Sequence, residues 1–180
     1  MKSFTLICKT ITYLGVFNCI LLSAQDWKWI NPLPTGNTLK QVYLVDTAVG
    51  FAIDDAGSVF KTADGGKTWK VRYSNDTLNL SSIYFTNSNT GYIAASSGVI
   101  LKTYNAGTTW QIIKSVSSNS LLSVFFTSTD TGYVAGYGGT ILKTTDAGAN
   151  WILLNSTTTK DLNKIVFPAT DTGYVLGNQG

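Results

Sequence analysis

The sequence predicts an all-β fold, a β-propeller built from four-stranded antiparallel blades, and three observations lead to this prediction. The same residues return every 41 positions, which is the repeat length of propeller blades and of helical arrays. Each repeat contains four short apolar segments separated by turn residues. The chain has no glutamate and only one methionine, which argues against long helices. The spacing is seen in two sets of residues: Gly50, Gly91, Gly132 and Gly173, and Trp69, Trp110 and Trp151.

The repeats divide the chain into about three and a half predicted blades, at 37–74, 78–115, 119–156 and, in part, 160–180. The first strands are expected at 42–44, 83–85, 124–126 and 165–167. The second strands begin at glycine and are expected at 50–53, 91–94, 132–135 and 173–176. The third strands are expected at 59–62, 100–103 and 141–144, and the fourth start at tryptophan, at 69–71, 110–113 and 151–154. All are rich in β-branched and aromatic residues and are bounded by Gly, Asp, Asn and Ser, which is typical of strands. Adjacent apolar residues such as Phe125 and Phe126 predict burial on both sheet faces, as in stacked blades.

The two ends of the chain differ from the repeats. Residues 1–24 are typical of a secretory signal peptide, with Lys2 and Lys9 before an apolar stretch and cleavage expected after Ala24. In the segment 25–36 that follows, Trp27 to Ile30 is expected to be an orphan fourth strand that would complete the last blade of a closed ring. The fourth repeat stops after its second strand. We therefore expect a larger propeller, completed by further C-terminal blades, with an obligate oligomer as the alternative.

Composition limits the possible functions. Removal of residues 1–24 lowers the net charge from +3 to +1, because Lys2 and Lys9 leave and no acidic residue does, so no nucleic-acid partner is expected. Cys8 and Cys19 leave as well, so the mature chain has no disulfide and no cysteine metal site. No histidine is available for a Ser-His-Asp or Cys-His site. We expect no cofactor, no metal and no membrane span after signal removal, and a secreted, periplasmic or cell-surface location.

A second motif lies between the third and fourth strands of each complete repeat, at 62–69, 103–110 and 144–151. Its pattern is a threonine, then an Asp or Asn, a glycine and a closing tryptophan. Asp and Asn accept hydrogen bonds from amides of their own turn, and glycine adopts backbone angles that other residues resist. The residues expected to build the blades in this way are Asp64, Gly66, Trp69, Asn105, Gly107, Trp110, Asp146, Gly148 and Trp151.

This motif resembles the Asp-box, or sialidase-type BNR, repeat. The whole unit is similar to propellers of the photosystem II assembly and stability factor type and to secreted bacterial proteins with the same repeat. The opening segment Trp27 to Asn37 fits the second group. The resemblance covers nearly all of the mature chain and implies a propeller.

The most variable parts of the repeats are the loops after the second and fourth strands, which open on one face of a propeller. Binding residues concentrate on loops that a rigid scaffold holds. The candidates are Asp54, Asp55, Asn75, Asp76, Ser96, Ser97, Tyr137, Asn178 and Gln179. The alternative is that these are solvated turn residues. Lys61, Lys102 and Lys143 recur at one position and are expected to reach solvent or to pair with a neighbouring blade.

Three functions are compatible with these features. The first is a non-catalytic module that binds a protein or a glycan, or assists assembly, through the variable loop face. The second is a fragment of a sialidase- or endoglucanase-like glycoside hydrolase, which usually needs two facing carboxyl groups. Arg72 is the only arginine, so the arginine cluster of a sialidase cannot form, and the neighbouring Asp54 and Asp55 should point to opposite faces. The third is a structural adhesin or stalk. The first is preferred, and no enzymatic activity is expected.

Overall fold

The computed structural model describes residues 35–178. The predicted signal peptide 1–24, the orphan strand Trp27 to Ile30 and the candidate Gln179 lie outside the described residues. The described chain folds into three four-stranded sheets and one two-stranded sheet. Their strands are β1 (Leu39–Leu44), β2 (Gly50–Asp54), β3 (Ser58–Thr62), β4 (Lys70–Ser74), β5 (Leu80–Phe85), β6 (Gly91–Ala95), β7 (Val99–Thr103), β8 (Gln111–Lys114), β9 (Leu121–Phe126), β10 (Gly132–Gly136), β11 (Ile141–Thr144), β12 (Ile152–Leu154), β13 (Leu162–Ala169) and β14 (Thr172–Gly177). The predicted fold, about three and a half blades of a β-propeller, is confirmed.

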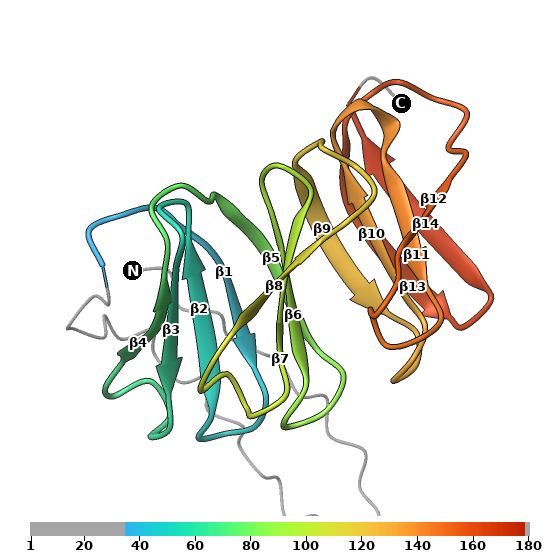
Figure 1. The fold of residues 1–180 in the computed structure, drawn as a ribbon. Helices are drawn as coiled ribbons and strands as arrows, with labels where there is room; N and C mark the ends of the chain where they lie inside the picture. Colours follow the sequence, from blue (N-terminus) through green and yellow to red (C-terminus); the bar gives the residue numbers. More distant parts are fainter. Residues whose placement is uncertain (1–34, 179–180) are drawn as a thin grey trace, which may run out of the picture.

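Within each sheet the strands follow sequence order, and every neighbouring pair is antiparallel. The sheets stand in a row from the β1–β4 sheet to the β13–β14 sheet (Figure 1). The first strands of successive blades are in contact, β1 with β5, β5 with β9 and β9 with β13. First strands therefore form the inner side of the array, and fourth strands its outer edge.

The core is divided into layers between blades. One cluster joins blade 1 to blade 2, a second joins blade 2 to blade 3, and a third joins blade 3 to β13 and β14. The strands β2, β6 and β7 are buried along their whole length, as the adjacent apolar residues predicted. Burial of apolar area between stacked sheets is the main stabilising term in such an arrangement.

Hydrogen bonds join the same positions in successive blades. Gln41 donates through Nε2 to the Ile83 carbonyl and accepts from the Ile83 amide. Ser82 accepts from the Val124 amide, and Ser123 accepts from the Ile165 amide. The expectation that the repeated lysine pairs with a neighbouring blade is confirmed for two members, because Lys61 donates to the Ala106 carbonyl and Lys102 to the Ala147 carbonyl.

The fourth strands begin one residue later than predicted. The β4, β8 and β12 strands start at Lys70, Gln111 and Ile152, so each tryptophan lies before its strand. Trp110 instead lies edge-on to Phe51 and Phe85, which joins the turn to the layer between two blades. Trp110 is thus an interface residue, whereas the prediction treated it as the first strand residue.

The only helical element among residues 35–178 is a 3-10 turn at Tyr137–Gly139. No helix in this part of the chain is long and apolar enough to cross a membrane.

Candidate functional site

A hollow of about 520 Å³ opens where the inner strands and the turns after the second strands converge. Three repeat positions supply almost all of its lining. The turns after the second strands contribute Asp55, Ser96 and Tyr137, which are three of the predicted loop-face residues. The residues before or at the start of the first strands contribute Asn79, Leu80 and Ser120. The first strands themselves contribute Lys40, Ser81, Leu122 and Asn163.

The last set of lining residues was not singled out from the sequence. In each blade the pairing of the first two strands skips one first-strand residue, which forms a β-bulge: Lys40, Ser81, Leu122 and Asn163. Bulges commonly re-aim a side chain beside a functional site. The sequence does carry one signal for these four residues. Each follows a leucine that recurs in every repeat, yet the four residues themselves differ.

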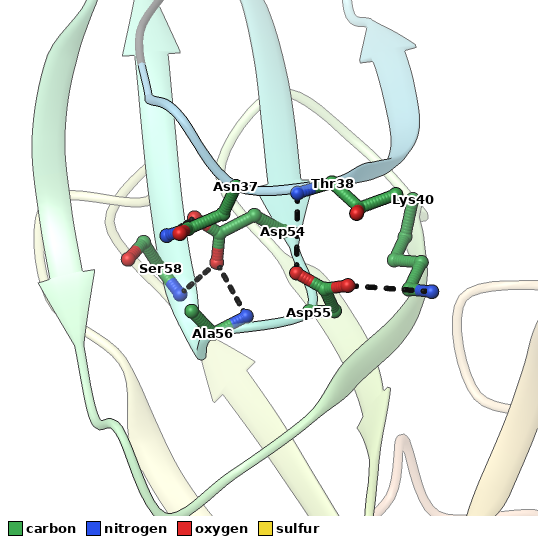
Figure 2. Close-up of polar contacts among 7 residues, drawn as sticks. All are labelled: Asn37, Thr38, Lys40, Asp54, Asp55, Ala56 and Ser58. Atoms are coloured by element: carbon green, nitrogen blue, oxygen red, sulfur yellow. Dashed lines mark hydrogen bonds and ion pairs between the residues drawn. The ribbon is translucent and has the colours of Figure 1, made fainter.

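Two neighbouring aspartates after β2 have different roles (Figure 2). Asp54 is fully buried, and its carboxylate accepts bonds from the amides of Ala56 and Ser58 and from the side chain of Asn37. Asp55 accepts from the Thr38 amide and lies 3.7 Å from the Lys40 ammonium, on the rim of the hollow. The two side chains point apart, as their adjacent positions predicted. Asp54 therefore holds the turn, and only Asp55 faces the opening.

Tyr137 stands on a short turn with a fixed backbone. Its backbone amide donates to the Ser120 carbonyl, and its own carbonyl accepts from the Asn119 side-chain Nδ2 and the Thr140 hydroxyl. The next amide, of Gly138, donates to Asp161. The tyrosine side chain is nevertheless 47% exposed at the hollow. An exposed aromatic ring on a rigid turn is a pre-organised contact surface.

The other predicted loop-face residues lie outside the hollow. Asn75 accepts bonds from the amide and hydroxyl of Thr77 within its own turn. Asp76 and Ser97 are exposed, and Asn178 is exposed and accepts a bond from Asn163. That any of these residues binds a ligand stays a prediction.

A second depression lies on the same loop face, between blades 2 and 3. It has a volume of about 610 Å³ and is bounded by 116–119, by the turn at 138–140 and by the end of β12 with the loop that follows. The loop face therefore carries two adjoining recesses around the Tyr137 turn.

The Asp-box turns form closed hydrogen-bond networks. The Asp64 carboxylate accepts from the Thr62 hydroxyl, the Thr68 amide and the Thr68 hydroxyl. These bonds hold the pKa of Asp64 at about 2, and the Thr144 and Asn150 bonds hold that of Asp146 at about 2. Asn105 replaces the carboxylate in blade 2 and still accepts from Thr109. The oxygens of these boxes are engaged in the turn itself.

The hollow has little net charge, since its one lysine is paired with its one aspartate. Hydroxyl and amide groups make up most of its remaining polar lining. Within residues 35–178, no group of three or more His, Cys, Asp or Glu is placed to hold a metal ion. The arrangement suits hydrogen bonding and ring stacking with a ligand.

The sequence matches the family described as photosynthesis system II assembly factor YCF48, over residues 20–119 and 111–180. The chain belongs to this family. Both the repeat and the blade topology agree with that assignment. A search of curated proteins found no match.

Solved structures with the same fold include two YCF48 proteins. One, described as YCF48 bound to D1 peptide, is 17% identical with a TM-score of 0.52, over 87% of this chain and 66% of that one. The other, YCF48 from Cyanidioschyzon merolae, is 19% identical with a TM-score of 0.64, over 79% of this chain and 49% of that one. An ancestral GH74 enzyme is 18% identical with a TM-score of 0.68, over 88% of this chain and 24% of that one. The chain thus spans about two-thirds or less of these proteins, and the likeness is one of fold.

Proposed function

We propose that this protein is a non-catalytic binding module that takes up an extended segment of a partner protein at the hollow of its loop face. The observation that carries the proposal is the convergence of variable side chains from all four blades on one opening, with a half-exposed tyrosine on a fixed turn. Rigid scaffolds that present variable loops are typical of binding proteins. A peptide is the proposed ligand class because one YCF48 of the same family was solved with a peptide.

The geometry of the carboxylates favours binding over hydrolysis. Glycoside hydrolysis usually needs an acid and a second carboxylate facing each other across the substrate. Asp55 is paired with Lys40, and Asp54 is buried and engaged by turn amides. A glycoside hydrolase is kept as the alternative because the GH74 enzyme shares the fold. A purely structural adhesin or stalk would need no such opening.

We further propose that the protein is secreted or displayed at the cell surface. Support comes from the lysine-flanked apolar segment before Ala24 and from the absence of cysteine after it.

The test is selection of ligands from a display library of unstructured peptides, followed by measurement of their dissociation constants. Tyr137→Ala and Lys40→Gln should each raise the dissociation constant of the selected peptides about tenfold, which corresponds to about 1.4 kcal/mol of binding free energy. Tyr104→Ala is the matched control, because Tyr104 is 58% exposed and lies in an Asp-box turn, away from the hollow.

Three results would contradict the proposal. Equally strong peptide binding in the Tyr137 and Lys40 variants would place the ligand elsewhere. Binding to a glycan array, with no peptide selected, would change the ligand class. Turnover of a chromogenic glycoside, lost in Asp55→Asn, would favour the hydrolase.

A further inference from the structure

Each blade brings two particular residues to the loop face. One is the bulge residue of its first strand, and the other is the residue directly after its second strand. All of them except Asn178 line the hollow. We call the two residues of one blade its rim pair. In blade order the rim pairs are Lys40 and Asp55, Ser81 and Ser96, Leu122 and Tyr137, and Asn163 and Asn178.

The two members of a rim pair match each other in chemistry. In blade 1 the Lys40 ammonium lies 3.7 Å from the Asp55 carboxylate (Figure 2). In blade 4 the side-chain amide of Asn163 donates to the side-chain oxygen of Asn178 over 2.7 Å. Blade 2 has two serines, and blade 3 has a leucine and a tyrosine. The chemistry therefore agrees within a blade and changes from one blade to the next.

Blade 3 supplies the exposed apolar surface of the hollow. Leu122 is half-buried, and Tyr137 is 47% exposed. The third hydrophobic residue of the lining, Leu80, is fully buried. An apolar side chain of a ligand gains by leaving water at this surface. The same side chain placed over the serines or asparagines would instead cover polar groups without giving them a partner.

Blade 1 supplies the charged surface of the hollow. The side chain of Lys40 is 42% exposed, and that of Asp55 is 35% exposed. Asp55 also accepts a bond from the Thr38 amide. The ammonium has three N–H donors, and one carboxylate at 3.7 Å does not use them all. A carboxylate is the acceptor that such a donor binds most strongly.

We propose that the rim pairs are the specificity-determining residues of the loop face, and that each blade reads one part of the ligand through its own pair. This inference rests on the proposed function, in which the ligand is an extended segment of a partner protein. The Leu122 and Tyr137 pair holds an apolar or aromatic side chain of that segment, and Lys40 holds an acidic one. Stacked sheets lie about 10 Å apart and an extended chain rises about 3.3 Å per residue, so these two ligand residues are at most about six positions apart.

The test exchanges rim pairs and repeats the peptide selection. The Leu122→Ser, Tyr137→Ser double variant gives blade 3 the pair of blade 2. It should lose the enrichment of apolar and aromatic residues and should bind peptides selected on the parent chain at least tenfold more weakly. The Lys40→Ser, Asp55→Ser double variant should lose the enrichment of acidic residues and keep the apolar one. Ile152→Ser is the matched control, because Ile152 is 57% exposed on the outer strand β12 of blade 3, and it should leave both enrichments unchanged.

The reverse exchange tests for a gain that loss of folding cannot imitate. The Ser81→Leu, Ser96→Tyr double variant gives blade 2 the pair of blade 3, so the peptides selected on it should contain a second apolar position. Circular dichroism of every variant checks that it is folded.

The outcomes separate this inference from the proposed function. Peptides selected without an apolar or acidic preference would overturn the role of the rim pairs and leave peptide binding intact. Preferences that persist in the blade 3 and blade 1 variants, or no new apolar position in the blade 2 variant, would overturn it as well. A parent chain that selects no peptide would contradict the proposed function itself.

Discussion

At the scale of single residues, the Asp-box shows how three residues fix one turn. The side chains of Thr62 and Asp64 accept hydrogen bonds from backbone amides of the turn. Gly66 supplies a backbone with φ of 87°. The same bonds recur in the other two boxes, with Asn105 in place of a carboxylate in blade 2. The natural Asp-to-Asn exchange makes the electrostatic contribution separable from the hydrogen bonds.

This exchange leads to a prediction about acid stability. Asp64 and Asp146 have pKa values of about 2 in the folded protein, against an ordinary value of 3.8. A lowered folded-state pKa stabilises the protein above the unfolded value, and this stabilisation is lost as the pH falls from 3.8 toward about 2. In the Asp64→Asn, Asp146→Asn double variant, the urea midpoint should therefore fall less steeply across that range.

The reciprocal change provides the control. Asn105→Asp should make the loss of stability over the same pH range steeper, because it adds a third carboxylate held by its turn. Identical pH profiles in the parent chain, the double variant and the Asn105 variant would contradict the account.

At the scale of elements, the blade interface makes otherwise equivalent glycines unequal. Gly66 and Gly107 both have positive φ and occupy the same place in their boxes. A Cβ on Gly107 would lie 2.3 Å from Cε1 of Phe51 in the preceding blade, whereas one on Gly66 would lie 3.9 Å from the nearest atom, in Trp69. The difference arises from packing between blades, since the turns themselves are alike.

Alanine substitution at these two glycines is expected to separate turn strain from packing. Gly66→Ala should cost about 1–2 kcal/mol for the left-handed backbone. Gly107→Ala should cost about 1–3 kcal/mol more, because Phe51 or the turn must shift. Urea unfolding of both variants measures the difference, and equal losses of stability would show that the interface does not constrain Gly107.

The sequence predicted most of the elements but not their exact contacts. A fixed period and glycine-bounded apolar segments were enough to locate every strand of residues 35–178, because each blade repeats the same local chemistry. The start of β4 and its equivalents was missed, because tryptophan is a good strand residue and only tertiary packing shows that it leaves the strand. The bulges at Lys40, Ser81, Leu122 and Asn163 were missed because register depends on pairing between strands.

The candidate site was predicted only in part. Asp55, Ser96 and Tyr137 do meet at one opening. Asp54 is also an aspartate and directly precedes Asp55 in the sequence, yet it is buried beneath the turn. Alternation along the strand predicted that the two would diverge, but it could not tell which one would face the opening.

At the scale of the whole molecule, the architecture assigns different tasks to different surfaces. The faces between blades carry contacts that recur from blade to blade, namely stacked rings and turn carbonyls. The loop face carries side chains that vary from blade to blade. The hollow is held by inner strands that contact one another in succession, so its lining is pre-organised before any ligand arrives. We infer that this loop face is the ligand-binding surface.

The most direct test of that claim is amide hydrogen exchange of the full chain with and without a saturating peptide selected on it. Slowed exchange is expected to centre on the turns after the second strands, at 54–57, 96–98 and 136–139. Protection centred instead on the opposite turns, at 46–49, 87–90 and 128–131, would contradict it.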